Sequence, residues 1–196
     1  MNLWRKETPI YVVSGLPRSG TSLMMQMLEA GGVPVLVDAE RPADESNPRG
    51  YYEYAPVKRI YAGDAAWLRG ARGKAVKVVS ALLSALPAIH TYRVIFMQRP
   101  LDEVLRSQRA MLTRLNRETP ESDDKMLEDT ERHLWAIDQW LTTQRGVSAL
   151  HVGYHDVLAD PRAQAEAVAK FLGLQLDIDA MVKVVDPALH RERGES

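Results

Sequence analysis

The sequence of 196 residues contains no cysteine. This absence excludes disulfide bonds, zinc sites built from thiolates and cysteine nucleophiles, and it is compatible with a reducing compartment. Long apolar runs are missing too: none approaches the roughly 20 residues that a membrane helix needs. The apolar run nearest the N-terminus, residues 10–13, is too short for a secretory signal. We therefore expect a soluble, cytoplasmic protein without a membrane partner.

The sequence also has little net charge, because 26 acidic residues offset 25 Lys and Arg residues. A net charge of −1 creates no field over the whole molecule that would attract nucleic acid, so we expect no nucleic-acid partner. The basic residues are biased, however, with 7 Lys and 18 Arg. The planar guanidinium group suits phosphate and sulfate oxygens, although codon bias in a GC-rich genome would explain the same excess. An anion site must therefore be local.

Short apolar segments alternate with segments of helical spacing along the chain. Strands are predicted at 10–13, 75–79, 92–97 and 148–152, and helices at 21–30, 81–86, 101–115, 125–145 and 161–172. Strands that are mostly apolar favour a parallel sheet covered on both faces. We predict one α/β domain over residues 1–196, a three-layer sandwich around a P-loop-type central parallel sheet. The proline-rich segment 33–54 is predicted to form a loop over the site.

The strongest motif is the segment from Gly15 to Ser22, between a predicted strand and a predicted helix. Its glycines have the P-loop spacing, G-x-x-x-x-G-K-[ST], which lets backbone N–H groups surround a phosphate at a helix N-terminus. Thr21 stands where a nucleoside triphosphatase has its lysine, while Ser22 keeps the position of a magnesium ligand. The cation is instead Arg18, next to the hydroxyl of Ser19. We expect this loop to bind an oxyanion without the lysine of ATP chemistry.

A second motif follows the predicted strand at 92–97. Arg99 lies where this strand ends, and Ser107 lies about two turns into the next predicted helix. Both side chains can contact one phosphate if that helix packs against the edge of the sheet. Tyr154 is a third candidate, because it lies at the carboxyl end of a strand, where open α/β sheets place ligand contacts. A packing role for Tyr154 is the alternative.

In this order the segments resemble the sulfotransferases that use 3′-phosphoadenylyl sulfate (PAPS) and release adenosine 3′,5′-bisphosphate (PAP). The segment Pro17-Arg18-Ser19-Gly20-Thr21-Ser22 is similar to their 5′-phosphosulfate loop, in the Arg form of the bacterial, Golgi and tyrosylprotein branches rather than the cytosolic steroid and phenol branch. Arg99 and Ser107 resemble their 3′-phosphate motif, and residues 153–174 resemble the segment whose Tyr contacts adenine. The resemblance implies that PAPS is bound by Gly15, Pro17, Arg18, Ser19, Gly20, Thr21, Ser22, Arg99, Ser107 and Tyr154.

Sulfuryl transfer requires a cation at the transferring group and a base for the acceptor's proton. Arg18 is the predicted cation, and Lys77, at the end of a predicted strand, is either a second cation or a solvated lysine. Cytosolic members of the family use a His near this strand end, but no His follows Lys77. Bacterial members often have an Asn-Pro-x-Gly-Tyr-x-Glu segment, which ends here at Glu53. We therefore prefer Glu53 over Glu40 and Asp38 as the base, with a solvated loop carboxylate as the alternative in each case.

The resemblance predicts an enzyme that transfers the PAPS sulfuryl group to a hydroxyl or amine of a small-molecule or peptide acceptor, without a metal. The family's C-terminal Gly-x-x-Gly clamp is missing, and the chain is short for the family. The acceptor site is therefore expected to be small or shallow, unless a second copy in a homo-oligomer completes it. Two alternatives remain: a P-loop kinase or nucleotidase whose basic residue has moved, and a module that binds PAPS or PAP without catalysis.

Overall fold

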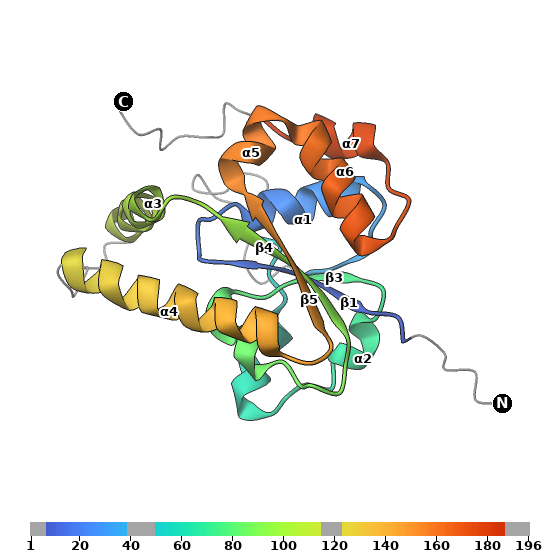
Figure 1. Ribbon diagram of the computed structural model, residues 1–196, viewed down its shortest axis with the longest axis horizontal. Helices are drawn as coiled ribbons and strands as arrows, with labels where there is room; N and C mark the ends of the chain where they lie inside the picture. Colours follow the sequence, from blue (N-terminus) through green and yellow to red (C-terminus); the bar gives the residue numbers. More distant parts are fainter. Residues whose placement is uncertain (1–6, 39–49, 115–122, 187–196) are drawn as a thin grey trace.

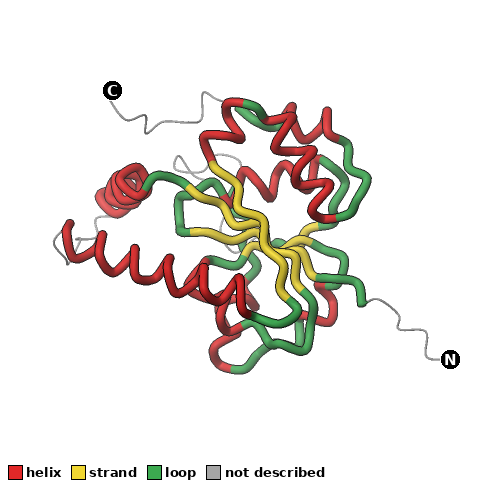
Figure 2. Tube along the Cα trace, viewed as in Figure 1, coloured by secondary structure: helices red, strands yellow, loops and turns green. Residues whose placement is uncertain are grey.

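The computed structural model describes residues 7–38, 50–114 and 123–186. Its middle layer is one five-stranded sheet with the order β2-β3-β1-β4-β5, in which all neighbouring strands are parallel (Figures 1 and 2). The strands are β1 (Ile10–Gly15), β2 (Val35–Leu36), β3 (Ala75–Lys77), β4 (Tyr92–Gln98) and β5 (Val147–Gly153). The α-helices are α1 (Thr21–Ala30), α2 (Leu68–Ala71), α3 (Leu101–Arg114), α4 (Asp123–Thr143), α5 (Tyr154–Ala159), α6 (Pro161–Leu172) and α7 (Ile178–Lys183), and the 3₁₀ helices are η1 (Ala55–Ala62) and η2 (Ser80–Ala85).

The central strands β1 and β4 are largely buried on both faces, which explains their apolar runs at residues 10–13 and 94–97. In β1, Tyr11 and Val13 join the core under α1, α6 and α7, whereas Ile10 and Val12 join the core under η1, α2, η2 and α4. This alternation follows from the two-residue period of a strand. Figure 1 shows α1, α5, α6 and α7 on one side of the sheet and α2 and α4 on the other. The predicted three-layer α/β fold is therefore confirmed.

The segment that we predicted as a loop over 33–54 contains the edge strand β2. Val35 and Leu36 pair with Ala75 and Val76 of β3, and a two-residue strand is too short to produce a detectable alternation. Residues 39–49 of this segment lie outside the described residues.

The strand predicted at 75–79 was too long, because β3 ends at Lys77. The helix predicted at 81–86 is instead the 3₁₀ helix η2, which begins at Ser80. The short helices η1, α2, α5 and α7 were not predicted, since apolar periodicity needs more than a turn or two to be recognised. No helix among the described residues is long and apolar enough to cross a membrane.

Candidate functional site

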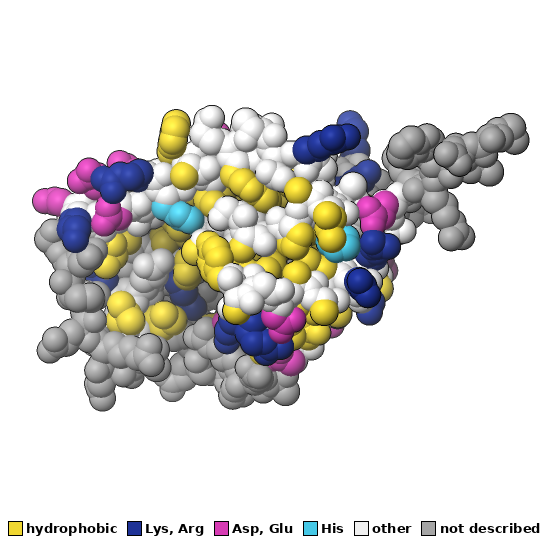
Figure 3. Space-filling view, turned by 90° about the horizontal axis from the view of Figure 1, so that it is seen from below, with side chains coloured by type: hydrophobic (Ala, Val, Ile, Leu, Met, Phe, Trp, Pro, Cys, Tyr) yellow, Lys and Arg dark blue, Asp and Glu magenta, His cyan; other side chains and the backbone are white. Residues whose placement is uncertain are grey.

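The candidate site lies at the carboxyl edge of the sheet. Parallel strands all end at the same edge, so the chain segments that follow β1, β3, β4 and β5 are brought together there. Arg18, Arg99 and Tyr154 lie in these segments, and Lys77 is the last residue of β3. Seen from below, the molecule is hollowed at the end that carries α3 and the start of α4, and Lys or Arg side chains lie in the hollow (Figure 3). The fold thus gathers positive charge at one edge.

The connection from β1 to α1 contains two residues with positive φ angles. Gly20 is the N-cap of α1 and has a φ of 96°, and Arg18 has a φ of 75°, a value that a residue with a side chain rarely adopts. Ser19 is buried, and its hydroxyl donates to the Leu16 carbonyl at 2.7 Å, which closes the turn. The first N–H groups of α1 have no partner within the helix itself, and a helix N-terminus of this kind favours an anion.

Two glycines of this loop are required by space as well as by backbone conformation. A Cβ at Gly15 would lie 2.6 Å from the carbonyl oxygen of Met97 on β4. A Cβ at Gly20 would lie 2.6 Å from the Tyr154 ring. Since ordinary contacts between carbon atoms are about 3.5–4.0 Å, both positions exclude a side chain. The glycine spacing therefore lets the loop pack directly against β4 and α5.

Arg18 and Ser107, which belong to the two different motifs, are in direct contact. Arg18 Nε donates to Ser107 Oγ at 3.0 Å, and Arg99 Nη1 donates to the Arg18 carbonyl at 3.2 Å. Gln108 of α3 also donates to the Pro17 carbonyl at 3.3 Å. The predicted 5′ loop and the predicted 3′-phosphate motif therefore form one continuous site.

Arg99 is held on several sides. Its guanidinium carbon lies 4.8 Å from the centre of the Tyr154 ring, and its Nε donates to Glu103 Oε2 at 2.8 Å. Burial raises the pKa of the Tyr154 hydroxyl, an effect that Arg99 opposes and Glu103 reinforces. Arg99 and Tyr154 thus form a cation–π pair beneath the loop.

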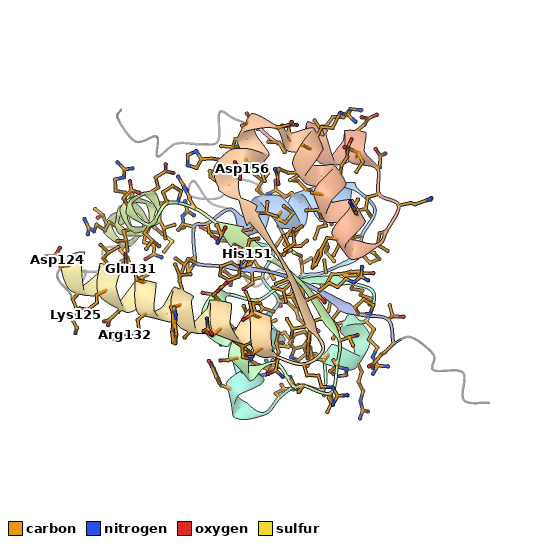
Figure 4. The ribbon with its side chains drawn as sticks, viewed as in Figure 1. Asp124, Lys125, Glu131, Arg132, His151 and Asp156 are labelled. Carbon is orange, nitrogen blue, oxygen red and sulfur yellow. The ribbon has the colours of Figure 1, made fainter. Side chains whose placement is uncertain are left out.

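The turn between β5 and α5 places Tyr154 in this group. Gly153 is the N-cap of α5, and a Cβ at this position would collide with the Asp156 carboxylate, which folds back over the turn. Asp156 is labelled on α5 in Figure 4. Because the turn is closed in this way, Tyr154 begins α5 rather than ending the strand, and its ring is mostly buried against the loop.

Lys77 contacts α1 and the segment after the undescribed residues 39–49. Its ammonium group donates to the carbonyl oxygen of Tyr51 and lies 3.4 Å from Ser22 Oγ. Ser22 Oγ also donates to the Tyr51 carbonyl at 3.2 Å. Only 8% of Lys77 is exposed, so it is not the solvated lysine that the sequence left as an alternative.

The three candidate bases have different surroundings. Glu53 pairs with Lys58 at 3.0 Å, and its side chain is 20% exposed. Asp38 Oδ2 accepts from the Ala55 N–H at 2.5 Å, and the Asp38 N–H donates to the Glu53 carbonyl at 3.0 Å. Asp38 and Glu53 are thereby brought together, whereas Glu40 lies outside the described residues.

Three polar residues near this edge were missed by the sequence analysis. Glu103 and His155 are bonded to each other through Oε1 and Nε2 at 3.0 Å. His133 Nε2 of α4 lies 2.9 Å from Ser80 Oγ, just beyond β3, and burial lowers the pKa of this imidazole. Each pair is separated by more than 50 residues in sequence, so no local spacing signals it. In the described part of the chain, no group of three or more His, Asp or Glu side chains could hold a metal ion.

No protein-family model and no curated protein matches the chain, but solved structures match its fold. A sulfotransferase from Mycobacterium tuberculosis matches with a TM-score of 0.58 and 18% identity, over 91% of this chain and 70% of that one. The sulfotransferase domain of a Synechococcus olefin synthase matches with a TM-score of 0.53 and 18% identity, over 99% and 83%. A mouse sulfotransferase in complex with PAP matches with a TM-score of 0.50 and 16% identity, over 91% and 63%. The chain therefore has the fold of the sulfotransferases, as the resemblance predicted.

Proposed function

We propose that the protein is a PAPS-dependent sulfotransferase that acts on a hydroxyl or amine of a small-molecule or peptide acceptor. The observation that carries this proposal is the junction of the two anion-binding motifs through Arg18, Ser107 and Arg99. PAPS carries two anionic groups on one ribose, the 5′-phosphosulfate and the 3′-phosphate. A protein that binds it needs two anion-binding segments side by side, and the contacts of Arg18 with Ser107 and Arg99 support this assignment.

The loop between β1 and α1 would hold the 5′-phosphosulfate, through its backbone N–H groups and the hydroxyls of Thr21 and Ser22. Arg99 and Ser107 would hold the 3′-phosphate, and Tyr154 would contact the adenine. Gly15 and Gly20 would support this arrangement indirectly, because they let the loop pack closely against Met97 and Tyr154. Lys77, Arg18 and Arg99 supply three positive charges on separate strand ends.

PAPS supplies an activated sulfuryl group, whose S–O bond to the 5′-phosphate breaks as the acceptor atom bonds to sulfur. Arg18 would stabilise the negative charge that develops on the bridging oxygen, which leaves with PAP. Lys77, whose ammonium group lies 3.4 Å from Ser22 Oγ, would stabilise the oxygens of the transferring group. Both side chains are partly or wholly removed from solvent, which strengthens their electrostatic effect.

Glu53 is our proposed base, which would take the proton released by the acceptor. Glu53 lies two residues after Tyr51, whose carbonyl oxygen is bonded to Lys77 and Ser22, so the segment is anchored at the site. Its ion pair with Lys58 is no obstacle, because 61% of the Lys58 side chain is exposed and such surface pairs are worth little. We also propose a cytoplasmic location, with which the absence of cysteine is compatible.

Isothermal titration calorimetry with PAP tests the nucleotide site, and transfer of labelled sulfuryl from PAPS to a panel of alcohols, phenols and amines tests the reaction. We expect PAP to bind without magnesium and Arg99→Ala to weaken it by at least about tenfold, the value of one charge-assisted hydrogen bond. No binding at millimolar PAP would exclude the proposal. Magnesium-dependent binding of ATP would favour a kinase, and PAP binding without transfer to any acceptor would favour a binding module.

A further inference from the structure

Glu103, in the first turn of α3, is an acidic residue inside the site that we propose for an anionic nucleotide. One of its oxygens accepts from Arg99 Nε at 2.8 Å, and the other lies 3.0 Å from His155 Nε2. The side chains of Arg99 and Glu103 are 7% and 9% exposed. A negative charge at this place opposes anion binding by simple electrostatics, so its presence requires an explanation.

Glu103 carries its charge over the whole physiological range. Burial alone raises the pKa of its carboxyl group, but hydrogen bonds from Arg99 and His155, together with their charges, outweigh burial and lower it. An ionised carboxylate only accepts hydrogen bonds. His155 Nε2 must therefore carry a hydrogen and donate it, whether the imidazole is neutral or charged.

The contacts of Arg99 fix the plane of its guanidinium group. Glu103 holds the Nε edge, the Arg18 carbonyl accepts from Nη1, and the Tyr154 ring covers one face. An arginine binds phosphate best through two parallel N–H groups, which requires one defined orientation of the plane. Glu103 is itself held in place by His155, through its other carboxylate oxygen.

The neighbouring acid has no such role. Asp102 is one residue earlier in the same helical turn, but its side chain is 71% exposed and pairs with Arg106 on the surface of α3. The two acids thus differ in contacts rather than in chemistry, which makes Asp102 a matched control.

We propose that Glu103 is a positioning residue, held by His155, that orients Arg99 for the 3′-phosphate of the nucleotide. This inference rests on the proposed function, because it assigns the 3′-phosphate to Arg99. By orienting Arg99, Glu103 gives the site a preference for a 3′-phosphorylated nucleotide over one that lacks this group.

A positioning role and a purely electrostatic role of Glu103 predict opposite changes in the affinity for PAP when Glu103 is substituted. If Glu103 acted only through its charge, removing that charge would strengthen the binding of PAP. If it positions Arg99 through a hydrogen bond, replacing it by a side chain of similar size without an acceptor weakens the binding of PAP. A replacement that keeps an acceptor leaves the binding of PAP unchanged. Glu103→Met and Glu103→Gln make this comparison, because both remove the charge and only Gln can still accept from Arg99 Nε.

The experiment is isothermal titration of these variants, and of Asp102→Met, with PAP and with adenosine 5′-monophosphate (AMP), which lacks the 3′-phosphate. We expect Glu103→Met to weaken PAP by about tenfold and to leave AMP within about twofold, since one charge-assisted contact is affected. Glu103→Gln should recover most of this loss, and Asp102→Met should leave both affinities unchanged. Tighter PAP binding in Glu103→Met, or an equal loss for PAP and AMP, would overturn the inference.

A buried arginine without its partner can unfold a protein, so a second variant is needed. His155 is suitable, because its side chain is 46% exposed. His155→Ala should reduce the preference for PAP over AMP in the same direction as Glu103→Met, by a few-fold; an unchanged preference contradicts the role of His155 and Glu103 as a pair. A wild-type protein that does not bind PAP refutes the proposed function itself. If the wild-type protein prefers PAP to AMP and Glu103→Met and His155→Ala keep the same preference, only this inference is refuted.

Discussion

Gly20→Ala is the substitution whose cost can be worked out most fully from the structure. Gly20 has a φ of 96°, which strains any residue with a side chain, and its added Cβ would lie 2.6 Å from Cδ2 and 3.2 Å from Cε2 of Tyr154. Gly32 has nearly the same φ, 95°, but nothing lies within 4 Å of its added Cβ. The two substitutions therefore share the backbone strain and differ in the collision.

The strain costs about 1–2 kcal/mol at either position. The collision requires the Tyr154 ring to move by about 1 Å relative to an ordinary carbon contact, and overpacking of this kind costs about 1–3 kcal/mol. Gly20→Ala should therefore destabilise the protein by about 2–5 kcal/mol in total, and Gly32→Ala by about 1–2 kcal/mol. For a protein of this size the difference corresponds to about 2–12 °C in Tm.

Thermal unfolding followed by circular dichroism measures both variants, and titration with PAP measures what happens at the site. Because Tyr154 packs against Arg99, its movement should weaken PAP in Gly20→Ala and leave PAP binding unchanged in Gly32→Ala. Equal losses of Tm in the two variants would show that Tyr154 does not pack against the loop. Our account of why the loop needs this glycine would then be wrong.

Four further predictions follow from single contacts. Lys77→Met should slow sulfuryl transfer by about tenfold or more, measured as PAP release, and should leave the affinity for PAP unchanged because PAP lacks the sulfuryl group. Asp160→Ala should cost about 1 kcal/mol in urea unfolding, because the Asp160 carboxylate accepts from the Ala163 N–H at the start of α6. His133→Leu should cost about 1–3 kcal/mol by the same measurement, since the buried Ser80 hydroxyl loses its partner. The pKa of Glu103 lies below its ordinary 4.5 in the folded protein, so its contribution to stability is present above about pH 4.5 and is lost as the pH falls through the lower folded value. Glu103→Gln should therefore reduce the dependence of the free energy of unfolding on pH in this acid range.

The sequence was sufficient for the layers of the fold because the central strands are buried on both faces. β1 and β4 contain apolar runs at residues 10–13 and 94–97, and α1 was predicted with its observed bounds because glycines stand on both sides of it. β2 was missed, since its two residues carry no period of their own and are held only by pairing with β3. Local sequence patterns therefore identified the elements that have an apolar pattern of their own. They failed for β2, which forms only by pairing with β3.

The candidate site divides in the same way. Arg18, Arg99 and Ser107 could be selected from spacing within short segments, because a strand end and the following helix fix where each side chain lies. Glu103 and His155 could not be selected, because their partnership is formed between α3 and α5 by the packing of the sheet edge. The residues that we propose as ligand contacts could thus be selected from local sequence, whereas the residues that position them are identified only from the fold.

The choice of base depends on this second kind of information. Asp38 uses its carboxylate to accept from the Ala55 N–H at the start of η1, so protonating it would weaken a charge-assisted hydrogen bond that holds the fold. Glu53 has a surface lysine as its ion-pair partner, which costs little to release. A base must gain and lose a proton in every cycle without disturbing the site around it. Glu53 meets this requirement better than Asp38. This physical argument supports the choice of Glu53, which in the sequence analysis came from the family resemblance alone.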